Sequence, residues 1–247
     1  MTYDEVIVIP ARYGSTRFSG KPLVDIDGVP MVVRVARLCW DALPPEQVIV
    51  ATDDDRIADV CRQNEIRVEM TSTAHPTGID RVAEVATRID SQSYINLMGD
   101  EPIFPVEDIL TMLSAVRKDR TRVHIGYTEI GEEKWRNSKI LKVLFGLRDN
   151  LIYIGRARVP GSHDGAFRVG WRHVCIHAYN REHLQRFAAT KGRTPVESAE
   201  DQEIMRFLEL GIDVHVVYMS DDSVSVDRPE DVDIVVKRLR EQRKHGG

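Results

Sequence analysis

The chain has 247 residues, of which 42% are hydrophobic and 30% charged, which allows one large α/β domain or one domain with a sizeable insertion. Its net charge of −5 argues against a nucleic-acid binder that works by bulk electrostatics. Cys39, Cys61 and Cys175 are scattered and form no C-x-x-C pair, so we expect core thiols in a reducing compartment. The first apolar run is too short for a signal peptide and no run reaches the length of a membrane span, which predicts a soluble cytoplasmic protein.

The first predicted element is a short buried strand at residues 6–9, which we expect Pro10 to end. The loop behind it carries three cations among small residues: Arg12, Arg17 and Lys21 with Gly14, Ser15, Thr16, Ser19 and Gly20. Glycines let a backbone approach a ligand closely, loop amides point N–H groups at it, and cations neutralise its charge. The loop therefore predicts a polyanionic ligand, for which a nucleoside triphosphate is the simplest candidate.

Two well-known phosphate loops do not fit this stretch. The spacing from Gly14 to Gly20 and Lys21 is one residue too long for a Walker A loop, and Pro22 replaces the hydroxyl residue that would hold magnesium. The Rossmann G-x-G-x-x-G pattern is absent as well. An ordinary basic surface loop is the alternative. We favour the ligand loop because ligands of open α/β sheets bind where strands end.

Strands and helices alternate along the first half of the chain. Helices are predicted at residues 30–40, from 53–55 to about 64, from about 80 and from about 106, with strands at 47–51, 66–70 and 94–98. The run Asp53-Asp54-Asp55 resembles a metal-binding D-x-D. Acids after a strand also suit a helix N-terminus, and we favour this second interpretation.

Thr77 and Gly78 offer a hydroxyl and an amide at the entry to the helix near Asp80. Arg81 lies in the first turn of that helix, where its charge opposes the helix dipole. One interpretation gives Arg81 a role in binding an acid. The other is a solvated ion pair with Asp80 or Glu84.

The strand at 94–98 runs directly into Gly99-Asp100-Glu101-Pro102. A carboxylate at a strand end suits Mg²⁺, which takes one or two carboxylates together with triphosphate oxygens. Asp100 could instead cap the helix near Val106, but several residues separate the two, so we favour the metal. Asp227, before the last helix, could be an N-cap or a second carboxylate facing Asp100.

Beyond about Lys118 the pattern changes to antiparallel strands at 123–130, 140–147, 151–154 and 169–179. Alternation places four side chains on one face of the last strand, where they could line a pocket or a subunit interface: Trp171, His173, His177 and Tyr179. The remaining elements are helices at 181–190 and 198–210, a strand at 214–219 and a helix to about 243. Glu197, Glu200 and Glu203 surround the start of the 198–210 helix.

Four separated blocks resemble the CMP-Kdo synthetase (3-deoxy-manno-octulosonate cytidylyltransferase) family: residues 10–23, 75–81, 99–102 and 226–231. Weaker matches are Arg172-His173 with Tyr179, and Pro195 with Glu197 and Glu200. The resemblance spans nearly the whole chain. The first and third blocks together are specific, whereas either alone would indicate only a sugar nucleotidyltransferase.

The resemblance implies an α/β protein with a Rossmann-like three-layer nucleotidyltransferase fold and a mixed, mostly parallel central sheet. Residues 1–247 would form one domain, with a small antiparallel dimerisation region inserted at about 120–180 and a homodimer as the assembly. The implied reaction uses CTP and Mg²⁺, joins CMP to the anomeric hydroxyl of a 3-deoxy-2-keto sugar acid, and releases pyrophosphate. The residue types fit this chemistry, since it needs positioning and charge neutralisation and no covalent intermediate.

The resemblance also assigns roles to residues. The nucleotide-binding set is Arg12, Ser15, Arg17, Lys21, Thr77 and Gly78. The metal ligands are Asp100 and Asp227, which with Lys21 and Arg12 form the catalytic set. The substrate-binding set is Arg81, Met98, His173, His177, Tyr179, Glu197 and Glu200.

Three positions depart from the family pattern: Met98 and Ile204 stand where the family usually has Gln, and His177 where it usually has Tyr. All three lie in or beside blocks that face the acceptor, so the resemblance supports CTP more firmly than Kdo. The acceptor could be Kdo, an amino derivative, another keto acid or a phosphonate. Other readings are a nucleotidyltransferase with a different base or a neutral sugar phosphate, and a non-catalytic nucleotide-binding module.

Overall fold

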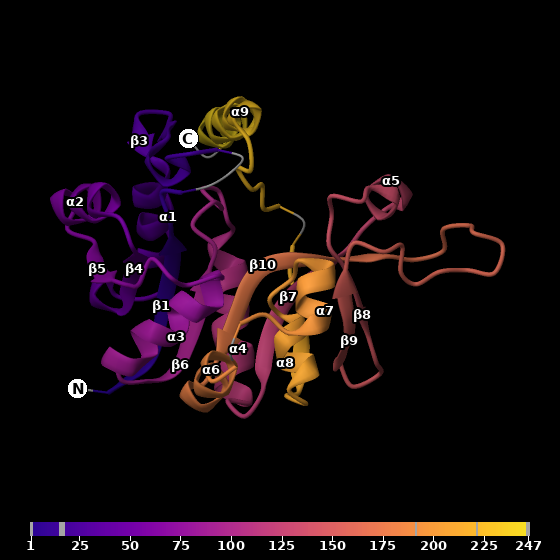
Figure 1. Ribbon diagram of the computed structural model, residues 1–247. Coiled ribbons are helices and arrows are strands. Elements are labelled where there is room, and N and C mark those ends of the chain that lie inside the picture. The colour runs from indigo at the N-terminus through magenta and orange to yellow at the C-terminus, as the bar shows by residue number, and fades with distance from the viewer. Residues whose placement is uncertain (1, 15–17, 191, 221, 246–247) are drawn as a thin grey trace.

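The computed structural model describes residues 2–14, 18–190, 192–220 and 222–245 (Figure 1). Within these ranges a nine-stranded mixed sheet has the main-path order β11-β7-β10-β6-β1-β4-β5, and a hairpin of β8 and β9 joins it at β10. The strands are β1 (Tyr3–Ala11), β4 (Val48–Thr52), β5 (Arg67–Met70), β6 (Ser91–Leu97), β7 (Val123–Glu129), β8 (Lys142–Phe145), β9 (Leu151–Gly155), β10 (Trp171–Tyr179) and β11 (Val214–Tyr218). A separate two-stranded sheet pairs β2 (Asp25–Ile26) with β3 (Val29–Pro30).

The sheet combines parallel and antiparallel ladders. Strands β6, β1, β4 and β5 pair parallel to one another, and β11 pairs parallel to β7. Strand β10 runs antiparallel to both β6 and β7, and β8 and β9 form an antiparallel hairpin. The predicted mixed, mostly parallel sheet and its antiparallel region are therefore confirmed.

Helices cover both faces of the sheet. They are α1 (Met31–Trp40), α2 (Asp55–Gln63), α3 (Gly78–Arg88), α4 (Val106–Lys118), α5 (Glu132–Arg136), α6 (Arg181–Ala188), α7 (Pro195–Glu200), α8 (Met205–Glu209) and α9 (Pro229–His245), with 3₁₀ turns η1 (Lys21–Leu23) and η2 (Pro45–Gln47). No helix in the described ranges combines the length and the apolar character that a bilayer crossing requires.

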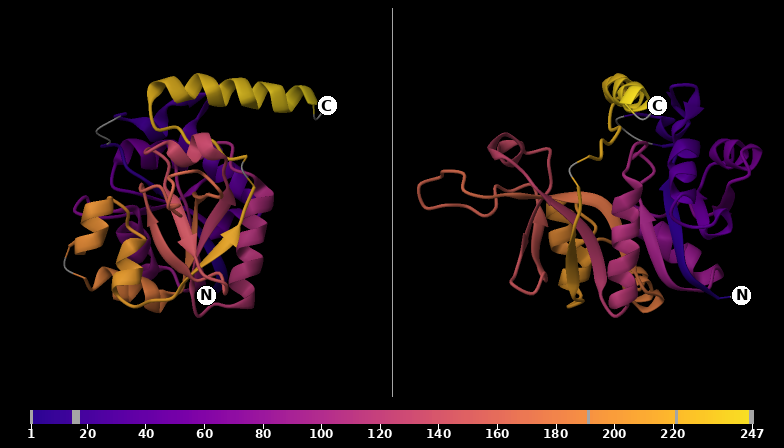
Figure 2. Two further views of the ribbon diagram at one scale, coloured as in Figure 1. Left: turned by 90° about the vertical axis from the view of Figure 1, so that its right-hand side faces the viewer. Right: turned by 180° about the vertical axis from the view of Figure 1, so that it is seen from behind.

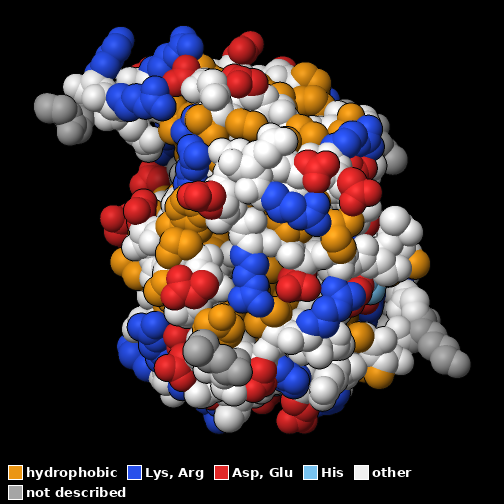
Figure 3. All heavy atoms as spheres, turned by 90° about the vertical axis from the view of Figure 1, so that its left-hand side faces the viewer, with side chains coloured by type: hydrophobic (Ala, Val, Ile, Leu, Met, Phe, Trp, Pro, Cys, Tyr) orange, Lys and Arg blue, Asp and Glu red, His pale blue; other side chains and the backbone are white. Residues whose placement is uncertain are grey.

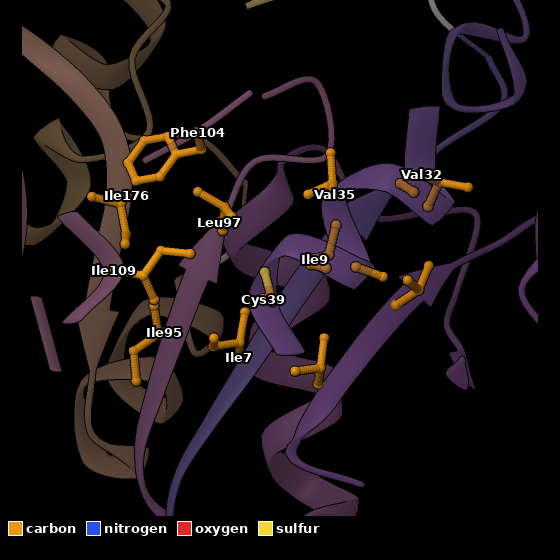
Figure 4. Packing of buried hydrophobic residues seen from close by; sticks show 14 of the residues in the cluster. Ile7, Ile9, Val32, Val35, Cys39, Ile95, Leu97, Phe104, Ile109 and Ile176 are labelled. Atoms are coloured by element: carbon orange, nitrogen blue, oxygen red, sulfur yellow. The ribbon is translucent and has the colours of Figure 1, made fainter. Parts of the chain in front are cut away.

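Two buried clusters hold the three layers together. On one face, Ile7 and Ile9 of β1 pack with Val35 of α1 and Ile109 of α4 (Figure 4). On the other, the alternate β1 residues join a cluster with α3, α6 and α8. Because successive strand side chains point to opposite faces, an unbroken apolar run such as that of β1 serves both layers.

One face of the molecule carries charged side chains of both signs. On the face shown in Figure 3, cationic and anionic side chains of the described residues are interspersed rather than gathered into one basic area. The C-terminal helix α9 lies across one end of the molecule, and the segment 156–170 projects away from the sheet beside the β8–β9 hairpin (Figures 1 and 2).

The expected end of the first strand at Pro10 is wrong. Strand β1 continues to Ala11, with Pro10 opposite Ala51 of β4. The ladder between β1 and β6 ends earlier, at Val8 and Asn96. Over this last stretch β1 pairs on one side only, and a strand with a free side accepts a residue without an N–H.

The expected helix at 198–210 is also wrong, because two short helices, α7 and α8, take its place. Asp201 adopts the left-handed conformation with φ 49°, which ends α7. Asp is among the few non-glycine residues that visit this region readily. The break brings the residues that follow Asp201 into a separate turn.

A buried arginine joins α3, α7 and α8. The Arg206 guanidinium donates to both oxygens of Glu197 at 2.7 and 2.6 Å and to Asp80 at 3.1 Å. It also lies 3.8 Å from the ring centroid of Phe187. The Arg206 and Glu197 side chains are 1% and 0% exposed, so neither charge could be accommodated without the other.

We therefore expect Arg206→Leu to lower the free energy of unfolding by about 3–5 kcal/mol, because it leaves buried carboxylates without a cation. Urea unfolding followed by circular dichroism measures this loss. The control is Arg186→Leu, an exposed arginine that donates to the Leu210 carbonyl, which should change stability by less than about 1 kcal/mol. Equal stability of both variants would contradict the prediction.

Candidate active site

A cavity of about 340 Å³ lies where β1 and β6 end at their carboxyl termini. Its described wall comes from the loop behind β1, the entry to α3, the end of β6, the turn between α7 and α8, and the segment before α9. Eight predicted site residues line it: Arg12, Lys21, Thr77, Gly78, Arg81, Met98, Asp100 and Asp227. Ser15 and Arg17 lie outside the described residues, so their predicted role stays a prediction.

Lys21 lies between two carboxylates that come from distant parts of the chain. Its Nζ is 2.6 Å from Asp100 Oδ2 and 3.8 Å from Asp227 Oδ1. Lys21 opens η1 directly after Gly20, whose φ of 72° is a left-handed conformation that suits glycine. The predicted meeting of the basic loop with both acids is thus present in the fold.

Two backbone features hold Asp100 in this place. A Cβ on Gly99 would lie 2.9 Å from the Pro10 carbonyl oxygen, so only glycine lets the end of β6 pass β1 this closely. The Val226 N–H donates to the Asp100 carbonyl at 2.9 Å and ties the segment before α9 to the same loop. Beside it, burial and the Asp100 charge raise the pKa of Glu101 to about 8, and Ser225 donates to its carboxyl at 2.5 Å.

The donor set fits a magnesium ion that arrives with phosphates. Asp100 and Asp227 supply hard carboxylate oxygens within reach of one point, the place of the Lys21 ammonium. In the described part of the chain, no three His, Cys, Asp or Glu side chains converge as a metal site. A divalent ion would therefore have two protein carboxylates and would complete its shell with ligand oxygens and water.

The entry to α3 presents polar groups to the cavity. The Thr77 hydroxyl accepts the Asp80 N–H at 3.2 Å as N-cap, so α3 begins at Gly78. The Ile79 N–H donates to Glu203 Oε2 at 3.1 Å. Burial raises the pKa of the Glu203 carboxyl above its usual range, although that N–H and the Thr77 hydroxyl oppose the rise.

Arg81 has a partner that sequence reasoning did not foresee. Its Nη2 donates to Asp53 at 2.8 Å, and its Nη1 donates to the Thr71 hydroxyl. The expected alternative, a solvated pair with Asp80 or Glu84, is wrong, because Arg81 is only 3% exposed. Those two acids pair with other cations.

Other predicted substrate-binding residues lie away from the described cavity wall. His173, His177 and Tyr179 share one buried face of β10, with the rings of the two histidines stacked at 4.9 Å between centroids. Burial lowers the pKa of His177 to about 3 and that of His173 well below its usual value. Glu197 is bound to Arg206, and Glu200 accepts the Tyr153 hydroxyl at 2.7 Å. The predicted roles of these five stay predictions.

The chain is similar to known proteins in its sequence. A family model described as Cytidylyltransferase matches residues 6–214. The 3-deoxy-manno-octulosonate cytidylyltransferase of Geobacter metallireducens is 38% identical over 94% of this chain and 96% of its own length. The chain belongs to the 3-deoxy-manno-octulosonate cytidylyltransferase family. The predicted resemblance is thereby confirmed.

Two further relatives are informative. The 8-amino-3,8-dideoxy-manno-octulosonate cytidylyltransferase of Shewanella piezotolerans is 35% identical, covering 94% of this chain and 97% of its own. The structure of a CMP:2-keto-3-deoxy-manno-octonic acid synthetase complexed with CTP superposes with a TM-score of 0.88 at 33% identity, covering 96% of this chain and 99% of that one. The family relationship and the shared fold therefore extend over almost the whole chain.

Several cavity residues were missed by sequence reasoning. They are His75, Arg193, Gln202 and Glu203. In the sequence, Glu203 stands out only as one of several acids at the start of a predicted helix, and that continuous helix leaves no place for the break at Asp201 that separates Glu203 from α7. The only local signal for that break was an Asp, which tolerates the left-handed conformation.

The two buried histidines predict a pH dependence of stability. His177 Nε2 lies 2.7 Å from His173 Nε2, and its folded pKa of about 3 lies below the ordinary value of 6.5. Below pH 6.5 the His177 imidazole becomes protonated in the unfolded chain but stays neutral in the folded chain. The free energy of unfolding therefore falls as the pH is lowered toward 3. Between pH 7 and pH 5 the loss in free energy of unfolding that comes from His177 is about 2 kcal/mol.

We expect His177→Gln to reduce that pH-dependent loss, since glutamine can keep a hydrogen bond to His173 but does not titrate. Denaturant unfolding at pH 5, 6 and 7 gives the slope for each protein. His163→Gln, an exposed histidine, is the control and should follow the wild-type slope. If His177→Gln kept the full wild-type slope, the histidine would not be neutral in the folded chain.

Proposed function

We propose that the chain transfers CMP from CTP to the anomeric hydroxyl of a 3-deoxy-2-keto sugar acid, Kdo or a modified Kdo, and releases pyrophosphate. The observation that carries this proposal is the convergence of Lys21, Asp100 and Asp227 at the ends of parallel strands. It occurs in a chain whose fold matches a CTP-bound synthetase over almost its full length.

The reaction requires the sugar hydroxyl to attack the α-phosphorus of CTP. A new oxygen–phosphorus bond forms, the bond from the α-phosphorus to the bridging oxygen breaks, pyrophosphate leaves, and the hydroxyl loses its proton. Lys21 and Arg12 lie on the cavity wall and would hold triphosphate oxygens. Fixed cations of this kind stabilise the charge that develops during transfer.

We propose Asp100 and Asp227 as the residues that hold Mg²⁺. When bound, the ion would neutralise phosphate charge and lower the pKa of the attacking hydroxyl. Before ligands bind, the Lys21 ammonium balances the same two carboxylates. The triphosphate would give Lys21 a new anionic partner. The Lys21 ammonium could then pair with the nucleotide instead of the two aspartates while it remains in the site.

Arg81 is the proposed partner of the acceptor's carboxylate. A guanidinium carries five N–H donors in a planar fork that matches a carboxylate. Arg81 lines the cavity and commits one N–H to Asp53 and one to Thr71. The Thr77 hydroxyl and the Gly78 backbone at the α3 entry are proposed to contact the nucleoside.

The direct test is pyrophosphate release from CTP, Mg²⁺ and an acid acceptor, with UTP, GTP and ATP compared at equal concentration. We expect turnover with CTP and with Kdo or 8-amino-3,8-dideoxy-manno-octulosonate. Measuring both acceptors decides between the two chemistries that the relatives' names offer. CTP binding without turnover on any keto acid would overturn the proposal in favour of a nucleotide-binding module.

Asp100→Asn and Asp227→Asn should each lower kcat by at least about 10²-fold, because an amide is a poor magnesium ligand. Circular dichroism and the unfolding midpoint should remain close to wild type, since both side chains line a cavity. Asp59→Asn, an exposed carboxylate on α2, is the control and should keep full activity. An active Asp100→Asn enzyme would remove this residue from the metal site.

We also propose a homodimer formed through the β8–β9 hairpin. Leu147 and Ile152 of that hairpin are exposed at 107% and 55%, and exposed apolar side chains that lie together are a common feature of protein interfaces. Light scattering should give twice the chain mass for the wild type and a single chain mass for Leu147→Glu/Ile152→Glu. An unchanged mass in this variant would place the interface elsewhere. A cytoplasmic location stays a prediction.

A further inference from the structure

The three consecutive aspartates behind β4 differ in their structural roles. Asp53 accepts from Arg81 at 2.8 Å. Asp54 is the N-cap of α2 and accepts the Arg56 N–H at 3.0 Å, while Asp55 is the exposed first residue of that helix. The expected capping role is confirmed for Asp54. The Asp53 carboxylate accepts from Arg81 instead, while the described cap hydrogen bond is made by Asp54.

Arg81 is held from two neighbouring strand ends. Asp53 follows β4 and Thr71 follows β5. Thr71 is itself fixed to the end of β4, because its N–H and its hydroxyl both donate to the Thr52 carbonyl, at 2.8 and 3.1 Å. The two acceptors that grip the Arg81 guanidinium therefore sit on one rigid edge of the parallel sheet.

The contacts with Asp53 and Thr71 fix the orientation of the guanidinium of Arg81, a residue that lines the cavity. Arginine is long and loses much rotamer freedom when it is held in one geometry. Arg81 is 3% exposed, is paired with Asp53 and is one of the residues that line the cavity, so it has both a counterion and ligand space beside it. A buried cation without Asp53 would turn toward another acid or toward water.

We propose that Asp53 is the positioning residue for the acid acceptor: it aims Arg81 at the acceptor's carboxylate and so sets the affinity for the acceptor but not for the nucleotide. This inference rests on the proposed function. Asp53 does not touch the reacting atoms, and its effect passes entirely through Arg81.

The test is steady-state kinetics with CTP and the acceptor varied separately. We expect Asp53→Ala to raise the acceptor KM by about tenfold or more, with the CTP KM and kcat changed less than about threefold, because a bidentate carboxylate site depends on the orientation of its arginine. Asp53→Asn should raise the acceptor KM less, since its amide oxygen can still accept from Arg81. The second variant also keeps the test available if Asp53→Ala folds poorly.

The neighbouring aspartate gives a matched control. Asp54→Ala removes the cap of α2 and should lower Tm by about 2–4 °C. It should leave both KM values unchanged. A purely structural role for Asp53 would produce this same pattern, a lower Tm with an unchanged acceptor KM, and that result would overturn the inference.

A double-mutant cycle isolates the path through Arg81. In an Arg81→Met background the acceptor KM is already raised, and Asp53→Ala should add less than about twofold. Full additivity would overturn the inference. Wild-type chain that turns over no acid acceptor would instead overturn the proposed function, so the two failures are distinguishable.

Discussion

The Lys21 ammonium between the Asp100 and Asp227 carboxylates is the interaction on which the site depends. Two like charges this close to one point disfavour each other unless a cation lies between them. Asp100 is 21% exposed, whereas Asp227 is 56% exposed and its interaction is more strongly screened by water. The lysine thus pairs mainly with Asp100, and Asp227 is the more solvent-exposed of the two carboxylates.

Backbone contacts make this charge arrangement possible. Lys21, Asp100 and Asp227 come from three distant segments, with Lys21 and Asp100 alone 79 residues apart, and all three segments must end at the same place in the fold. Gly99 allows β6 to pass β1 closely, and the Val226 N–H bonded to the Asp100 carbonyl holds the segment before α9. The charges are therefore brought together by sheet geometry rather than by attraction alone.

Features that depend on short stretches of chain could be predicted from the sequence. The apolar run before a basic glycine-rich loop, and the apolar run that ends in Gly99-Asp100, each indicate a strand followed by functional residues. Parallel strand ends share one edge of a sheet, which predicts that Lys21 and Asp100 meet there. The cap formed by Asp54 is local as well and was predicted for the same reason.

Three other features depend on which distant segments pack together, and the sequence does not indicate them. The extension of β1 through Pro10 depends on which of its neighbours ends first. The pairing of Arg81 with Asp53 depends on the relative position of α3 and the end of β4. The break at Asp201 depends on the buried Glu197 and Arg206 on its two sides, which fix α7 and α8 in separate orientations.

Met98, His177 and Ile204, the three positions that are expected to depart from the family pattern, do not have equal access to the cavity. Met98 lines the cavity, whereas His177 and Ile204 are 2% and 0% exposed and are not among its described lining residues. Nε2 of His177 is committed to His173 at 2.7 Å. A ligand in the described cavity can contact the Met98 side chain. Any influence of His177 and Ile204 on it would be indirect, through the packing of other side chains. Met98 offers apolar surface without a strong hydrogen-bonding group. Of these three positions, Met98 is therefore the one from which a side chain can contact a ligand in the described cavity directly.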